Sequence, residues 1–241
     1  MKNKKEVILY IGDLLNNTLQ VQKTLKNCFQ SKIQFLDWTN YNLPKDEDLV
    51  DFLTNKIVLT YEKLNNNTLT IIVDSFGLTL LVNAINKYHL EYKKIIVINP
   101  ITNLMFIKSW TIKSLWIPRN SRDMAYKQMY LFNNFATQRD NPTFLKSIDI
   151  DLKYIIKNEK EVNLLFNQIL NYQCLLKCIK FLKINFNNII TIVGEFNPLL
   201  SKKEIKKMHT NEHQVVINNS GYALFWESPQ AVCAVIKSVI K

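Results

Sequence analysis

One segment of the chain reads Thr70-Ile71-Ile72-Val73-Asp74-Ser75-Phe76-Gly77-Leu78-Thr79-Leu80-Leu81. It begins with an apolar, β-branched run of the kind that forms a buried strand. The run stops at Ser75, and a helix-like pattern opens at Gly77. The segment therefore predicts a strand that turns sharply into a helix, with a serine at the turn.

This turn has the layout of a nucleophile elbow, in which a tight strand-to-helix connection lifts a serine hydroxyl above a parallel sheet. The usual signature is G-x-S-x-G. Ser75 and Gly77 fit it, and Val73 replaces the first glycine. A single S-x-G is a weak signal, but its place between a strand and a helix strengthens it. Ser75 is therefore a candidate nucleophile.

Segments typical of strands and helices alternate through much of the chain. Short apolar runs indicate strands at 7–11, 33–36, 69–74, 94–100, 189–193 and 214–217. Helical patterns cover about 15–29, 46–61, 77–88 and 229–240. This alternation predicts an α/β fold with a mainly parallel sheet flanked by helices.

The four glycines of the chain each follow a predicted strand: Gly12, Gly77, Gly194 and Gly221. Glycine is favoured where the backbone turns tightly or approaches a ligand. We expect all four to lie at the carboxyl edge of the sheet, where open α/β sheets bind their ligands.

The alternation stops between residues 101 and 185. This region is helical by pattern, and it contains aromatic residues and arginines: Trp110, Trp116, Tyr126, Tyr130, Phe132, Phe135, Arg119, Arg122 and Arg139. We expect a single domain over residues 1–241, with an inserted helical cap at 101–185 on the ligand side of the sheet. The aromatic side chains would line a ligand site, form a small core of the cap, or do both.

The formal net charge is +11 over 241 residues. Such a charge suits an acidic partner, but the lysines are scattered and no nucleic-acid-binding motif accompanies them. We therefore expect no nucleic-acid partner. No stretch approaches the length of a membrane span, and the apolar run at 7–11 is too short for the core of a signal peptide.

The four cysteines are too few and too dispersed to predict a disulfide framework. Cys174 and Cys178 are four positions apart on a predicted helix, without a second pair at zinc spacing. We interpret the cysteines as reduced core residues of a cytoplasmic protein, and we expect no metal and no cofactor.

Six short motifs follow one another along the chain: Tyr10-Ile11-Gly12-Asp13, Val73-Asp74-Ser75-Phe76-Gly77, Val97-Ile98-Asn99-Pro100, Ile192-Val193-Gly194-Glu195-Phe196-Asn197-Pro198-Leu199, Asn218-Asn219-Ser220-Gly221-Tyr222 and Trp226-Glu227-Ser228-Pro229-Gln230-Ala231-Val232. In order and spacing they resemble the α/β-hydrolase fold family, its lidded esterase and thioesterase branch in particular. The counterparts are the oxyanion loop, the nucleophile elbow, the strand before the cap, the acid-bearing segment, the base-bearing segment and the start of the last helix. The resemblance covers nearly the full length.

The resemblance implies Ser75 as nucleophile, with the backbone N–H groups of Phe76 and Asp13 as the oxyanion hole. It places Asn197 at the position of the catalytic acid and Tyr222 at that of the base. An asparagine carries no charge to stabilise an imidazolium, and a tyrosine with a pKa near 10 is a poor base at neutral pH. The catalytic triad is therefore degenerate.

Other residues could replace the missing histidine. His89, His209 and His213 are the three histidines of the chain, and each is predicted to lie away from the strand ends that carry Ser75 and Tyr222. Glu195 and the lysines of the cap are further alternatives.

Two functions follow from this resemblance. The first is an acyl ester or thioester hydrolase of weak or unusual activity, acting on a small acyl-containing substrate, for which an acidic carrier protein is a candidate partner. The alternative is a catalytically inactive hydrolase-fold protein that acts as a ligand-binding or protein-interaction module.

Overall fold

The structure is a computed structural model of the chain. It describes residues 6–12, 18–29, 33–36, 38, 41–45, 48–64, 68–100, 142, 159–169, 172–197, 200–209 and 211–240.

Six strands form one sheet: β1 (Glu6–Ile11), β2 (Ile33–Leu36), β3 (Thr68–Asp74), β4 (Lys94–Ile98), β5 (Ile189–Gly194) and β6 (Gln214–Ile217). Their order is β2-β1-β3-β4-β5-β6, and every neighbouring pair is parallel. The chain moves outward from β1 to β2 and then returns to place β3 on the other side of β1. The carboxyl ends of β1 and β3 therefore flank a topological switch point, where open α/β sheets bind ligands.

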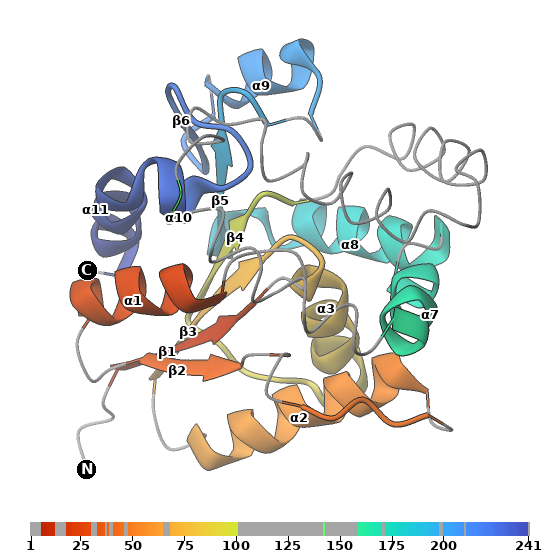
Figure 1. Cartoon of the computed structure of the whole chain (residues 1–241). Helices are drawn as coiled ribbons and strands as arrows, with labels where there is room; N and C mark the ends of the chain where they lie inside the picture. The colour runs from red at the N-terminus through yellow and green to blue at the C-terminus, as the bar shows by residue number, and fades with distance from the viewer. Residues whose placement is uncertain are drawn as a thin grey trace.

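Helices cover both faces of the sheet (Figure 1). On one face lie α1 (Thr18–Phe29) and α11 (Pro229–Ile240), next to the short α10 (Leu224–Glu227). On the other lie α2 (Leu49–Leu64), α3 (Gly77–Tyr88), α7 (Glu159–Ile169) and α8 (Tyr172–Ile184). The predicted fold class, an α/β fold with a parallel sheet between helices, is confirmed.

Strand β3 shows how the sequence builds two cores. Ile71 and Val73 pack among the side chains of the α2–α3 face, whereas Ile72 packs among those of the α1–α11 face. All three are fully buried. Successive side chains of a strand point to opposite faces, so a central strand covered on both sides must be apolar throughout. Each such side chain contributes roughly 1.5–3 kcal/mol relative to an exposed one.

The helix α2 begins three residues later than its sequence pattern predicts. The Asp48 carboxylate accepts hydrogen bonds from the N–H groups of Val50 (2.9 Å) and Asp51 (3.1 Å). A side chain that satisfies these first donors fixes the start of a helix. The last turn runs on to Leu64, because Leu64 also packs against the core.

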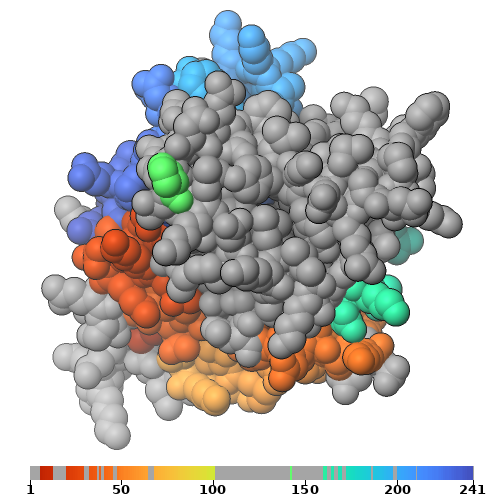
Figure 2. Space-filling view, in the orientation of Figure 1, coloured from red at the N-terminus to blue at the C-terminus, as the bar shows by residue number. Residues whose placement is uncertain are grey.

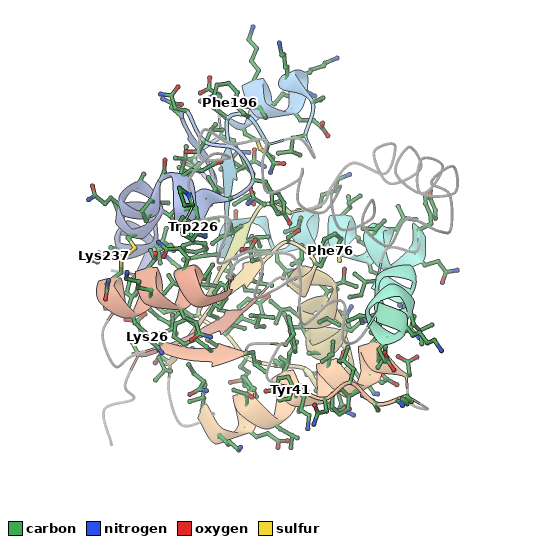
Figure 3. All side chains as sticks on the ribbon, in the orientation of Figure 1. Lys26, Tyr41, Phe76, Phe196, Trp226 and Lys237 are labelled. Atoms are coloured by element: carbon green, nitrogen blue, oxygen red, sulfur yellow. A yellow bond between two sulfur atoms is a disulfide. The ribbon has the colours of Figure 1, made fainter. Side chains whose placement is uncertain are left out.

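Helix α9 (Lys202–Met208) connects β5 to β6 and is opened by a capping box between Ser201 and Glu204. It stands out from the sheet at the top of the molecule in Figures 1 and 2. Phe196, labelled beside it in Figure 3, is 53 % exposed.

Within the region expected to form the cap, the structure describes residues 142, 159–169 and 172–185. There, α7 packs against α2, and α8 packs against α3. Leu165, Cys178 and Phe181 are buried in the core of that face. Residues 101–141 and 143–158 lie outside the described residues, so the cap at 101–185 stays a prediction.

The prediction of reduced cysteines is wrong for two of the four. Cys28 of α1 and Cys233 of α11 form a disulfide, and Cys174 and Cys178 lie outside it. The partners are 205 positions apart, and only the packing of α1 beside α11 brings them together. Disulfides are typical of oxidising compartments, so this bond does not support a cytoplasmic location. No helix in the described part of the chain is long and apolar enough to cross a membrane.

Candidate active site

Ser75 occupies a strained turn at the carboxyl end of β3. Its φ is 42°, in the left-handed region, and its side chain is 2 % exposed. The Ser75 N–H donates to the Ile98 carbonyl (2.8 Å), and the Ser75 carbonyl accepts from the Leu78 N–H (3.1 Å). A non-glycine residue in this conformation costs about 1–3 kcal/mol and persists only where its surroundings hold it. The predicted strained elbow is present.

Gly77 brings the loop after β1 close to the elbow. A Cβ atom at Gly77 would lie 2.8 Å from the Gly12 carbonyl oxygen and 3.2 Å from that of Ile11. Only glycine fits without movement of this backbone. The Gly12 carbonyl also accepts a 2.6 Å hydrogen bond from Trp38 Nε1. Trp38 therefore anchors the loop that would carry the oxyanion hole, a function that its sequence position did not reveal.

The two predicted oxyanion donors are only partly placed. Phe76, labelled in Figure 3, precedes α3 directly and is nearly buried. Its amide therefore lies at the amino end of a helix, where backbone N–H groups and the helix dipole favour negative charge. Asp13 lies outside the described residues.

Tyr222 contacts Ser75 directly. The Tyr222 hydroxyl donates a hydrogen bond to Ser75 Oγ over 2.5 Å, and Tyr222 is 2 % exposed. The loop after β6 thus brings the predicted base position to the predicted nucleophile, 147 positions earlier in the chain. In this protonation state the phenol donates to the serine, so it is not acting as a base. Loss of the phenol proton would reverse the bond and let Ser75 donate.

Asn197 lies in the same network but is linked to Tyr222 through a residue that the sequence did not single out. Asn197 Nδ2 donates to Asn99 Oδ1 (2.9 Å), and Asn99 Nδ2 donates to the Tyr222 main-chain oxygen (2.7 Å). Both asparagines are buried. The available signal for Asn99 was a polar side chain between an apolar strand and a proline.

The loop that carries Tyr222 is fixed from two sides. A Cβ atom at Gly194 would lie 2.0 Å from the Gly221 oxygen, so the loops after β5 and β6 are in backbone contact. The Phe196 N–H donates to the Ser220 carbonyl (2.8 Å). These contacts explain the glycine at position 194, because the main chain of the loop after β6 leaves no room for a Cβ atom there.

Glu227 holds the same loop from α10. Its Oε2 accepts a short hydrogen bond from the Gly221 N–H, next to Tyr222. Burial raises the pKa of Glu227 to about 7, partly offset by this hydrogen bond. The resemblance placed Glu227 at the start of the last helix without a function.

The three histidines and Glu195 make their contacts away from Ser75, whereas the lysines of the cap before residue 159 lie outside the described residues. His89 and His209 are exposed at the carboxyl ends of α3 and α9. His213 precedes β6, where its carbonyl accepts from the Thr191 N–H (2.9 Å). Glu195 Oε2 accepts from the Asn219 N–H (2.9 Å). Within the described ranges, no group of three His, Cys, Asp or Glu side chains could hold a metal ion.

No protein-family model matches the sequence, and no curated protein matches it. Solved structures do match the fold. A haloalkane dehalogenase from Bradyrhizobium elkani has a TM-score of 0.68 at 10 % identity, over 100 % of this chain and 91 % of its own. An N-acyl homoserine lactone degrading enzyme has a TM-score of 0.66 at 9 % identity, over 98 % and 93 %. An α/β-hydrolase enzyme from a Medee basin deep-sea metagenome library has a TM-score of 0.56 at 16 % identity, over 99 % and 90 %.

These similarities show that the chain has the α/β-hydrolase fold. Two of the matched proteins are named for different activities, haloalkane dehalogenation and the degradation of N-acyl homoserine lactones. Because one fold serves many reactions, the reaction of this protein must be argued from its own site.

Proposed function

We propose that this protein is an acyl ester or thioester hydrolase of low activity, with Ser75 as its nucleophile. The observation that carries the proposal is the buried, left-handed Ser75 at the switch point of the sheet, with its Oγ hydrogen-bonded to Tyr222 over 2.5 Å. Strained backbone at a serine is costly, and it clusters at sites where function requires it.

In the proposed reaction, Ser75 Oγ attacks the acyl carbonyl carbon while the Tyr222 phenolate takes the serine proton. The oxyanion of the tetrahedral intermediate would accept hydrogen bonds from the backbone N–H groups of Phe76 and Asp13. Tyr222 then returns the proton to the leaving alcohol or thiol as the carbon–oxygen or carbon–sulfur bond breaks. Tyr222 then takes a proton from water as the water oxygen attacks the acyl carbon, and it returns that proton to Ser75 Oγ as the carbon–oxygen bond to Ser75 breaks and the acid leaves.

Low activity follows from the residues at the acid and base positions. A phenolate is a minor species at neutral pH, because free phenols ionise near pH 10. Asn197 adds no negative charge to support proton transfer, and its amide donates to Asn99 instead. A missing general base typically costs a factor of about 10²–10⁴.

The proposal extends to the acyl donor, which we expect to be an acidic acyl carrier protein. The net charge of +11 favours an anionic acyl donor over a neutral one through electrostatic attraction. Hydrolysis of a carrier-bound thioester should then weaken with added salt more than hydrolysis of a neutral short-chain thioester.

The proposal is tested by treating the protein with a fluorophosphonate and identifying the modified peptide by mass spectrometry. We expect slow labelling at Ser75, together with weak hydrolysis of activated acyl esters. Both should be lost in Ser75→Ala and kept in Ser238→Ala, which alters an exposed serine on α11. Absence of labelling at every pH would contradict the proposal and favour the alternative, a catalytically inactive ligand-binding or protein-interaction module.

A further inference from the structure

Asn99 lies where three parts of the carboxyl edge meet. It follows β4 directly, and its side chain is completely buried. Its φ is 48°, and its N–H donates to the Ile192 carbonyl of β5 (2.9 Å). Asparagine is among the few residues other than glycine that adopt the left-handed conformation readily. The backbone of Asn99 is therefore held between β4 and β5.

The Asn99 side chain joins the loop after β5 to the loop after β6. Its Oδ1 accepts from Asn197 Nδ2 (2.9 Å), and its Nδ2 donates to the main-chain oxygen of Tyr222 (2.7 Å). The amide carries its donor and acceptor on one rigid plane, so both bonds fix the same side-chain orientation. A buried polar side chain that is hydrogen-bonded through both its donor and its acceptor group favours one local structure.

We infer that Asn99 is a positioning residue, which holds the main chain of Tyr222 so that the phenol reaches Ser75 Oγ. The inference rests on the proposed function, in which Tyr222 exchanges a proton with Ser75. The two hydroxyl oxygens lie 2.5 Å apart, and O–H···O hydrogen bonds extend only to about 3.0 Å, so a shift of about 1 Å in the main chain of Tyr222 would break this contact. A misplacement of about 1 Å at a reacting group can cost a factor of about 10² in rate.

The first test compares two asparagine-to-glycine substitutions. Asn99→Gly removes both side-chain hydrogen bonds and tolerates the left-handed backbone. Asn219→Gly is the matched control, because Asn219 is also left-handed (φ 56°) and lies three residues before Tyr222, but is exposed. At saturating fluorophosphonate, we expect Asn99→Gly to lower the rate constant of Ser75 labelling at least about tenfold. The Asn219→Gly rate should stay within about twofold of the natural protein.

The second test uses Asn99→Asp, which is nearly isosteric. This substitution should make the labelling rate depend on pH in a way that a purely structural defect would not. A protonated carboxyl group can donate to the Tyr222 carbonyl as the amide does, whereas a carboxylate cannot. Burial raises the pKa of a carboxyl group, so the protonated form is present at low pH and is lost as the pH rises. The labelling rate of Asn99→Asp, divided by that of the natural protein, should therefore fall as pH rises from about 5 to 9.

The outcomes separate this inference from the proposed function. Equal rates for Asn99→Gly and Asn219→Gly, or a ratio for Asn99→Asp that stays flat with pH, would overturn the inference. If the natural protein is not labelled at all, the proposed function fails. Asn99 is then tested by following the ionisation of Tyr222 through ultraviolet absorbance as a function of pH. The signal of Tyr222 is the difference between each protein and the same protein carrying Tyr222→Phe. We expect Asn99→Gly to move that titration and Asn219→Gly to leave it in place, and no movement would overturn the inference.

Discussion

At the scale of single residues, the proposed reaction depends on Tyr222, because this side chain is hydrogen-bonded to Ser75 Oγ. The Tyr222 hydroxyl donates to Ser75 Oγ, and both groups are almost completely buried. As a neutral phenol, Tyr222 engages a lone pair that Ser75 needs for attack. As a phenolate, it would accept the Ser75 proton and activate the same oxygen. The same contact therefore suppresses or promotes reaction, according to where the proton lies.

This dependence predicts the pH profile of the reaction. We expect the rate of fluorophosphonate labelling at Ser75 to rise with pH above neutrality, because only the phenolate accepts the serine proton. Tyr222→Phe should flatten that rise and lower the rate at alkaline pH by a factor of about 10²–10⁴. The measurement is the labelling rate between about pH 6 and 10. Tyr172→Phe, at an exposed tyrosine of α8, is the control. A Tyr222→Phe variant that labels faster at all pH values would show that the phenol only inhibits.

A second prediction restores the missing acid and base. The combination of Tyr222→His and Asn197→Asp should raise ester hydrolysis above that of the natural protein and of either single variant, since base and acid work as a unit. Asn99 affects the outcome, because its Oδ1 faces the side chain at position 197 over 2.9 Å. In the double variant the Asn99 amide must turn to donate to the new carboxylate. Initial rates on a short-chain activated ester provide the measurement, and no gain would indicate that the oxyanion hole is not formed.

Part of this site could be predicted from the sequence. Ser75 was located by its place between a strand and a helix, and Asn197 and Tyr222 by the resemblance to the α/β-hydrolase fold family. The structure places all three in one hydrogen-bonded network. Asn99 and Trp38 were missed as site residues, because their contacts depend on which strands become neighbours. A motif describes the spacing of residues along the sequence, whereas Asn99 and Trp38 bond to residues that are far from them in the sequence.

At the scale of elements, α10 controls the loop that carries Tyr222. Glu227 of α10 accepts from the Gly221 N–H, and the Ser220 and Ser228 hydroxyl oxygens lie 2.6 Å apart. These contacts join the end of β6 to the start of α11 around a single turn. A change in the charge of Glu227 would therefore act on the residue next to Tyr222.

The raised pKa of Glu227 predicts how stability changes with pH. In the fold this pKa is about 7, above the ordinary value of 4.5, so the folded protein binds more protons between these values than the unfolded chain. The contribution of Glu227 to stability therefore falls as pH rises from about 4.5 to 7. Glu227→Gln keeps an oxygen for the Gly221 N–H and removes the titration. We expect the melting temperature of the natural protein to fall by a few degrees relative to this variant over that range.

The control for this prediction is Glu62→Gln, at an exposed glutamate of α2. Its melting temperature should follow that of the natural protein at each pH. Parallel curves for the natural protein and Glu227→Gln would contradict a buried, titrating carboxyl group at this position.

At the scale of the whole molecule, the fold was largely predictable. The strands at 33–36 and 214–217 have the predicted bounds, and so does the last helix at 229–240. Apolar runs between turn residues predict such elements because a doubly covered sheet requires them. The pairing of Cys28 with Cys233 was not predictable, since it depends on how α1 and α11 pack over one face of the sheet.

That disulfide gives the last prediction. It links a helix near the start of the chain to the final helix, across 205 positions. A cross-link over so long a segment restricts the unfolded chain, and native disulfides typically contribute about 2–4 kcal/mol. We expect the Cys28→Ser/Cys233→Ser double variant to lose stability of that order in urea unfolding under oxidising conditions. Cys174→Ser, at a half-buried cysteine outside the disulfide, should change it by less than about 1 kcal/mol. A reductant should lower the stability of the natural protein to that of the double variant and leave the double variant unchanged. Alkylation of all four cysteines after unfolding without a reductant would contradict the bond and restore the case for a reducing compartment.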